Sequence, residues 1–109
     1  MSKYKSEISG NLDIFISEIE NDFEGEITKW NEILIHGDSV GLKSLAELLN
    51  RIADLNQNEI TELPIGAREH IHLSPNVDLS KSSVEVIIGR LDAKGTNEFY
   101  NRYVEKNGE

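Results

Sequence analysis

The sequence predicts a single α+β domain over residues 1–109, in which a mostly antiparallel four-stranded sheet packs one face against a long amphipathic helix. Three observations predict this fold. Two segments near the N-terminus alternate in polarity as strands do, a central segment has apolar residues three and four apart, and two shorter β-rich segments follow. The resulting order, β-β-α-β-β, is typical of an α+β sandwich. A chain of 109 residues is long enough for one domain with its own core.

The first two strands are predicted to form a hairpin over residues 11–36, after a weakly ordered segment at residues 1–10. Both strands are rich in β-branched and aromatic residues, and the ENDFEG stretch between them supplies the residues that turns use. Leu12 is expected opposite either Leu34 or Ile35, since the two registers match apolar residues about equally well.

The helix is predicted over residues 38–56, where the apolar period changes to three and four. Its apolar stripe consists of Leu42, Leu45, Ala46, Leu48, Leu49, Ile52, Ala53 and Leu55. Asp38 or Ser39 can accept hydrogen bonds from the free amides of the first turn. Burial of this stripe is expected to be the largest contribution to the core, at roughly 1.5 to 3 kcal/mol for each fully buried Leu or Ile.

Two further strands are predicted within residues 69–92. The second of them, in the SVEVIIGRLD segment, is apolar on both sides near its middle, which predicts a position inside the sheet rather than at an edge. Residues 96–107 form either a short final helix or a tail. The helix alternative depends on apolar side chains at helix-like steps, namely Phe99, Tyr100, Tyr103 and Val104.

The composition favours a soluble cytoplasmic protein. The formal net charge of −9 disfavours nucleic acid and anionic membranes as partners, since both are polyanions. The absence of cysteine rules out disulfides and thiolate metal sites and is compatible with a reducing compartment. The opening MSKYKSEISG has no apolar segment of the kind a secretory signal needs, and no apolar run approaches the roughly 20 residues that span a bilayer.

An unusual cluster of negative charge lies in SEIENDFEGEI, where a carboxylate occurs at every second position. These residues are Glu18, Glu20, Asp22, Glu24 and Glu26. We expect a turn near Asp22 to crowd them at one hairpin tip. Considered alone, the residues favour first a solvated end that prevents edge-to-edge pairing, then a docking surface for a positively charged partner. A calcium site ranks a distant third, because the spacing of a calcium-binding loop is absent.

The three histidines, His36, His70 and His72, are the candidates for a metal or acid/base site. His70 and His72 project from one face of an extended REHIHL segment, and His36 could in principle supply a third ligand. We favour the simpler interpretation, in which the strand buries Ile71 and Leu73 and leaves two polar residues on its wet face. We therefore predict no catalytic residue, no metal and no cofactor. A small metal-dependent or acid/base enzyme using the histidine pair is the alternative.

The chain from ILIHGDSVGLKSLAELLNRIADL through REHIHLSPNVDLSKSSVEVIIGRL resembles the immunity protein 32 family of bacterial polymorphic toxin systems. The resemblance covers roughly residues 33–92, and its most distinctive portion is E-H-I-H-L, Glu69 to Leu73. A histidine of that strand is a marked polar feature of the family, and His72 or His70 matches it.

The resemblance implies a small α+β protein without enzymatic activity that binds and neutralises a cognate toxin. Many such toxins are basic nucleases, so a protein of negative charge can occupy a surface built for phosphates. The resemblance therefore raises the docking interpretation of the acidic hairpin tip, and we expect the five acids together with His70 and His72 to contact the toxin. Self-association through a sheet edge is a further alternative, and the sequence predicts no particular oligomeric state.

Overall fold

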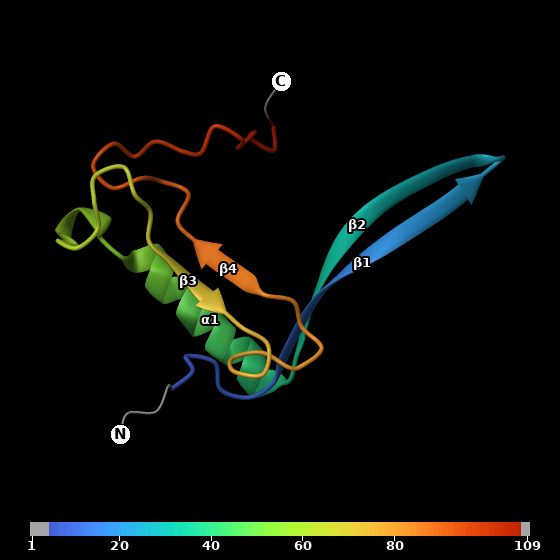
Figure 1. The fold of residues 1–109 in the computed structure, drawn as a ribbon, viewed down its shortest axis with the longest axis horizontal. Coiled ribbons are helices and arrows are strands. Elements are labelled where there is room, and N and C mark those ends of the chain that lie inside the picture. The colour runs from blue at the N-terminus through green and yellow to red at the C-terminus, as the bar shows by residue number, and fades with distance from the viewer. Residues whose placement is uncertain (1–4, 108–109) are drawn as a thin grey trace.

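The computed structural model describes residues 5–107 and has the predicted α+β architecture (Figure 1). Two long strands are followed by one long helix, a short 3-10 turn and two short strands. These elements are β1 (Leu12–Phe23), β2 (Glu26–Gly37), α1 (Ser39–Asp54), η1 (Gln57–Glu59), β3 (His70–Leu73) and β4 (Val86–Gly89). The predicted order β-β-α-β-β is therefore correct, with η1 inserted between α1 and β3.

The prediction of one four-stranded sheet is wrong, because the strands form two separate antiparallel sheets, β1–β2 and β3–β4. The segment before β4 does reach β1. The backbone N–H of Ser80 donates to the Leu12 carbonyl (2.8 Å), and that of Val84 donates to the Ile14 carbonyl (2.9 Å). The N–H of Ile14, however, donates to the side-chain oxygen of Ser83 (2.9 Å). A hydroxyl thus takes the place of the carbonyl that a continuous ladder would need.

The expectation that the last strand lies inside a sheet is also wrong. Within the described residues β4 pairs with β3 alone, and Ile87 on its outer face is 63% exposed. Residues 96–107 form the tail rather than the short helix. Phe99 and Tyr103 are each more than 40% exposed, so no packed surface covers the apolar face of a helix there. A helix of that length is marginal without such packing.

Asp38 caps the N-terminus of helix α1, which begins at Ser39. The Oδ1 of Asp38 accepts a hydrogen bond from the N–H of Gly41 (2.7 Å) in the first turn. The same carboxylate accepts from the backbone and side-chain N–H groups of Asn11, so it also attaches the helix to the start of β1. A Cβ on Gly41 would lie 2.1 Å from the Asn11 carbonyl oxygen, which explains glycine at this close approach. No helix within residues 5–107 is long and apolar enough to cross a membrane.

The core is small and lies between α1, the inner face of β3–β4 and the base of the hairpin. Its buried residues are Ile8, Leu12, Ile14, Leu45, Leu48, Ile52, Leu73 and Leu79. Ile71, Val86 and Ile88 pack against this cluster. Ile8 belongs to the segment predicted to be weakly ordered, of which residues 1–4 lie outside the described part of the chain.

The hairpin extends well beyond this core, and Figure 1 shows it projecting away from α1 and the second sheet. The molecule measures 57 × 42 × 22 Å, with a radius of gyration of 17.6 Å. A compact chain of this length would have a radius of gyration of roughly 13 Å. We call the projecting part, residues 16–33, the hairpin arm. It is the most protruding feature of the molecule.

Neither predicted register of the hairpin occurs, since Leu12 lies opposite Gly37. The turn decides the register. Glu24 (φ 53°) and Gly25 (φ 84°) form a two-residue connection in which both central residues have positive φ. This geometry suits the right-handed twist of paired strands, and glycine adopts it at little cost. The Asp22 side chain accepts a hydrogen bond from the Gly25 N–H (3.2 Å) and supports the turn.

Candidate protein-binding surfaces

The register of the hairpin places the acidic residues of β1 in one row. Directly opposed residues of antiparallel strands share a face, and so do alternate residues of one strand. Glu18, Glu20 and Asp22 therefore lie on the same face, and we call them the acidic row. Their partners on β2 are Asn31, Lys29 and Ile27, in that order. Lys29 is thus the basic residue that faces the row across the hairpin.

The two remaining acids of the cluster lie elsewhere on the tip. Glu24 is the first residue of the turn, and Glu26 lies opposite Phe23 on the face away from the acidic row. The structure thus distributes the five predicted acids among one face, the turn and the other face of the same tip. Within residues 5–107 the only ion pairs are Arg51 with Glu7 and Arg90 with Asp92, so none of the five is paired.

Apolar side chains are also exposed along the hairpin, and sequence reasoning missed this. Ile16 and Ile33 oppose each other next to the acidic row and are 56% and 68% exposed. The fold predicted from the sequence packs one face of the sheet against the helix, but β2 lies outside the core for most of its length. Exposed apolar residues beside charged ones are a feature of protein-binding surfaces.

The base of the hairpin is held by a cluster of hydroxyl groups around Asp13. Its Oδ1 accepts hydrogen bonds from the hydroxyls of Ser80 (2.9 Å), Ser82 (2.8 Å) and Ser83 (3.2 Å). These bonds, above all that from Ser82, lower the pKa of Asp13, because they favour the ionised carboxylate. The three serines thus attach the segment before β4 to the base of β1.

His70 and His72 lie side by side on the outer face of β3–β4, as the alternation of the strand predicts. Their ring centroids are 5.2 Å apart, and Ile71 and Leu73 point to the core. The Nδ1 of His70 lies 3.2 Å from the Arg68 carbonyl oxygen. Opposite the two histidines on β4 are Gly89 and Ile87, respectively, so the space above the strand pair is open.

A pocket of about 490 Å³ covers this outer face. Side chains from β3 and the segment just before it, from β4 and from the C-terminal tail line it, including Arg68, His70, His72, Ile87, Tyr100 and Arg102. The Arg68 guanidinium carbon lies 3.8 Å from the centroid of the Tyr100 ring, a cation–π contact that holds the tail against the sheet. The tail residues of this pocket carry no recognisable motif and were not predicted as site residues.

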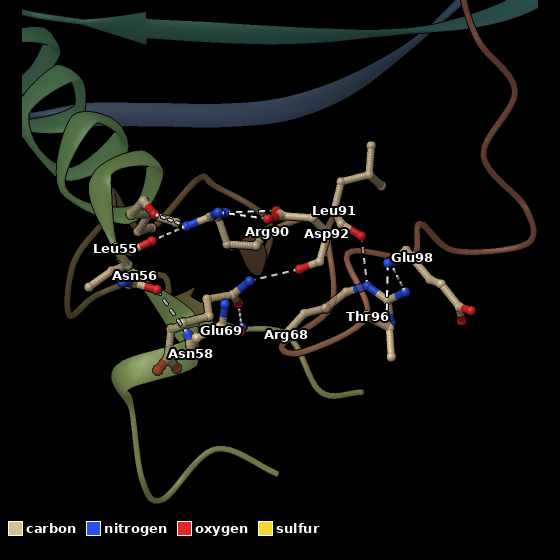
Figure 2. Close-up of polar contacts among 12 residues, drawn as sticks. Leu55, Asn56, Asn58, Arg68, Glu69, Arg90, Leu91, Asp92, Thr96 and Glu98 are labelled. Atoms are coloured by element: carbon tan, nitrogen blue, oxygen red, sulfur yellow. Dashed lines mark hydrogen bonds and ion pairs between the residues drawn. The ribbon is translucent and has the colours of Figure 1, made fainter. Parts of the chain in front are cut away.

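Arg68 and Arg90, which both line this pocket, belong to a network of polar contacts (Figure 2). Arg68 donates to the carbonyl oxygens of Leu91 and Glu98, both at 2.7 Å. Arg90 donates to the Leu55 carbonyl (2.7 Å) at the end of α1 and to the carboxylate of Asp92 (2.9 and 2.7 Å). The hydrogen bond and charge of Arg90 lower the pKa of Asp92. These arginines are therefore engaged in structure rather than free to act on a substrate.

His36 does not join the other histidines. It is the next-to-last residue of β2, opposite Asp13, and its ring contacts Phe15 with centroids 5.4 Å apart. In the part of the chain that the structure describes, no group of three or more potential ligand residues is placed to hold a metal ion. His70 and His72 alone are fewer ligands than a protein zinc site uses.

Comparison with known proteins identifies a family. A family model described as Immunity protein 32 matches residues 32–91. The match covers more than half of the chain, from within β2 to just past β4, and includes His70 and His72. It leaves out β1 and therefore the acidic row. No curated protein and no solved structure matches the chain significantly.

Proposed function

Since the chain belongs to the immunity protein 32 family, we propose that it is an immunity protein that binds and neutralises a cognate bacterial toxin. It acts by covering the toxin rather than by catalysis, and it uses no cofactor. The main contact lies on the hairpin arm and involves Glu18, Glu20, Asp22, Glu24 and Glu26. The toxin is a protein with a basic surface, such as a nuclease domain.

The acidic row supports this proposal most directly. Its three carboxylates lie on one face of an arm that projects from the body, and they have no ion-pair partner within residues 5–107. Only Lys29, opposite Glu20, faces the row with a positive charge, so the tip carries an excess of negative charge that a basic partner would neutralise. Clustered charge on a protruding element also accelerates association with an oppositely charged partner.

We place a second, smaller contact at His70 and His72. Both imidazoles are exposed on the outer face of β3–β4, beside the exposed Ile87. Imidazole both donates and accepts hydrogen bonds, and Ile87 offers apolar area, which is the mixed character of a protein interface. Because this pair lies within the matched region, it is the part of the contact that the family resemblance itself supports.

We expect a gene beside that of this chain to encode a toxin domain, and the test uses that domain. Calorimetric titration of that domain is expected to give one-to-one binding, and co-expression is expected to restore growth of cells that make it. Replacement of the five acids by Gln and Asn is expected to weaken binding about tenfold or more and to flatten its salt dependence. Replacement of His70 and His72 by Ala should have a smaller effect.

The matched control changes the same number of charges on the body of the protein. It replaces five exposed acids outside the arm: Glu47, Asp54, Glu59, Glu62 and Glu105. This variant is expected to keep affinity within about threefold of the wild type, because its charges lie outside the arm and exposed charges are screened over a Debye length of about 8 Å. Equal losses in the two variants would show that only net charge matters, and unchanged affinity in the arm variant would exclude the arm.

A further inference from the structure

One edge of β1 is available for pairing along the whole arm. In a hairpin closed by a two-residue turn, the residues flanking the turn exchange hydrogen bonds, and alternate residues then point their backbone groups outward. Phe23 and Glu26 flank the turn, so the even-numbered residues of β1 have their N–H and C=O groups directed away from β2. The bonds from Ser80 to Leu12 and from Val84 to Ile14 agree with this assignment.

This edge is already used for pairing at the base of the hairpin and is open beyond it. Residues 80–84 run beside β1 at Leu12 and Ile14 and then leave toward β4. Within the described chain, no other segment donates to or accepts from the outward backbone groups of the next four even-numbered residues. These residues are Ile16, Glu18, Glu20 and Asp22. The edge thus offers four consecutive pairing positions.

We infer that an extended segment of the toxin adds to this edge as a third strand, and this inference rests on the proposed function. The side chains along the edge specify its chemistry. Exposed Ile16 at the base calls for an apolar residue, and the acidic row farther out calls for Lys or Arg at alternate positions. Backbone hydrogen bonds supply affinity in this mode, and alternate side chains supply specificity.

A second copy of the chain is a poor occupant of the same edge. Antiparallel pairing of two β1 edges would place the acidic row of one copy against that of the other. Like charges directly opposed across strands are destabilising, so the row favours a basic segment and opposes self-association.

The edge of β2 is less suited to the same role. Its outward positions on the arm include Lys29, which faces Glu20 across the hairpin. Lysine on an edge strand commonly prevents addition of a further strand, and it would repel a basic segment. Glu20 on the β1 edge and Lys29 on the β2 edge are directly opposed and carry opposite charges. The same substitution at these two positions therefore compares the two edges of the arm.

The experiment removes one outward N–H from each edge in turn and measures affinity for the toxin domain by calorimetry. Glu20→Pro and Glu20→Gln lose the same charge, but only the proline loses the N–H. Proline is tolerated where an edge N–H faces solvent. Glu20→Pro is expected to bind about tenfold more weakly than Glu20→Gln, as one lost hydrogen bond with local misfit predicts. Lys29→Pro and Lys29→Gln should agree within about twofold.

Amide hydrogen exchange of the unmodified protein gives an independent readout if the proline disturbs the hairpin. In the free protein the amides of Glu18 and Glu20 should exchange fast, while those of Ile19 and Asn21, bonded to β2, are protected. Binding of the toxin domain should protect the outward amides.

Three results would overturn the inference. The first is equal affinity of Glu20→Pro and Glu20→Gln, with outward amides that stay unprotected when the toxin domain binds. The second is a larger effect of proline at Lys29 than at Glu20. The third is sedimentation that shows the free chain to be a dimer, together with protection of the outward amides of β1 in that dimer. If the wild type binds the toxin domain and any of these occurs, only the pairing mode is wrong. If the wild type does not bind it, the proposed function itself fails.

Discussion

Replacement of Arg90 by Met should destabilise the protein by about 2.3 to 3.5 kcal/mol. Arg90 follows β4, and its side chain is only 19% exposed. Its guanidinium connects three groups from two parts of the chain: the carbonyls of Ile52 (3.1 Å) and Leu55 (2.7 Å) at the end of α1, and the carboxylate of Asp92. It therefore joins the helix C-terminus to the second sheet. Methionine keeps the aliphatic stem but none of these bonds.

The magnitude follows from what each partner loses. The Ile52 carbonyl keeps the N–H of Leu55 (3.4 Å), so its loss is small. The Leu55 carbonyl loses a charged donor, at a cost of about 1.5 kcal/mol. The ion pair with Asp92, whose side chain is 30% exposed, contributes about 0.5 to 1 kcal/mol. A positive charge near a helix C-terminus contributes about 0.3 to 1 kcal/mol more.

Urea unfolding followed by far-UV circular dichroism at neutral pH measures this change. Arg102→Met is the control, because Arg102 lies in the exposed tail and its replacement should cost less than about 0.5 kcal/mol. Arg90→Lys should fall between the wild type and Arg90→Met, since lysine keeps the charge but not the planar fork of donors.

The pH dependence provides a second check on the same reasoning. Arg90 lowers the pKa of Asp92, so the contribution of the pair is present above the usual carboxyl pKa of 3.8 and is lost as the pH falls through the lowered value. The difference between wild type and Arg90→Met should therefore shrink below that pH. A loss for Arg90→Met no larger than that for Arg102→Met would refute the proposed role of Arg90.

Two further predictions concern the core and the base of the hairpin. Leu48 is 1% exposed and Leu49 is 44% exposed on the same helix. Leu48→Ala should therefore lower the free energy of unfolding, measured in urea, by about 3 to 5 kcal/mol, and Leu49→Ala by less than about 1 kcal/mol. Similar losses for the two variants would contradict the assigned core face of α1. The pKa of Asp13 is lowered by the hydroxyls of Ser82 and Ser80, so its stabilisation should be lost as the pH falls from the usual 3.8 through the lowered value. The urea midpoint of the wild type should therefore fall more steeply over that range than that of Asp13→Asn, and parallel curves would exclude the hydroxyl cluster as the cause.

For the candidate contact residues, the sequence predicted the face of the strand on which each side chain lies. Alternation placed His70 and His72 on the solvent side of β3, because a strand directs successive side chains to opposite faces whatever its partners are. The same rule placed Glu18, Glu20 and Asp22 on one face of β1. The pocket lining from Arg68, Tyr100 and Arg102 was missed, because it forms only when the tail folds back over the second sheet.

The sequence by itself determined the elements of this protein: a hairpin, one helix with Asp38 at its N-terminus, and two short strands with alternating faces. These depend on residue period, capping and turn chemistry, all of which act over a few neighbouring positions. Only the tertiary structure decided how the strands are grouped. The side chain of Ser83 interrupts the ladder between β1 and the segment before β4, and within the described residues the two strand pairs stay separate. Strand pairing between distant segments depends on such long-range contacts, so the open edge of β1 could be found only in the folded chain.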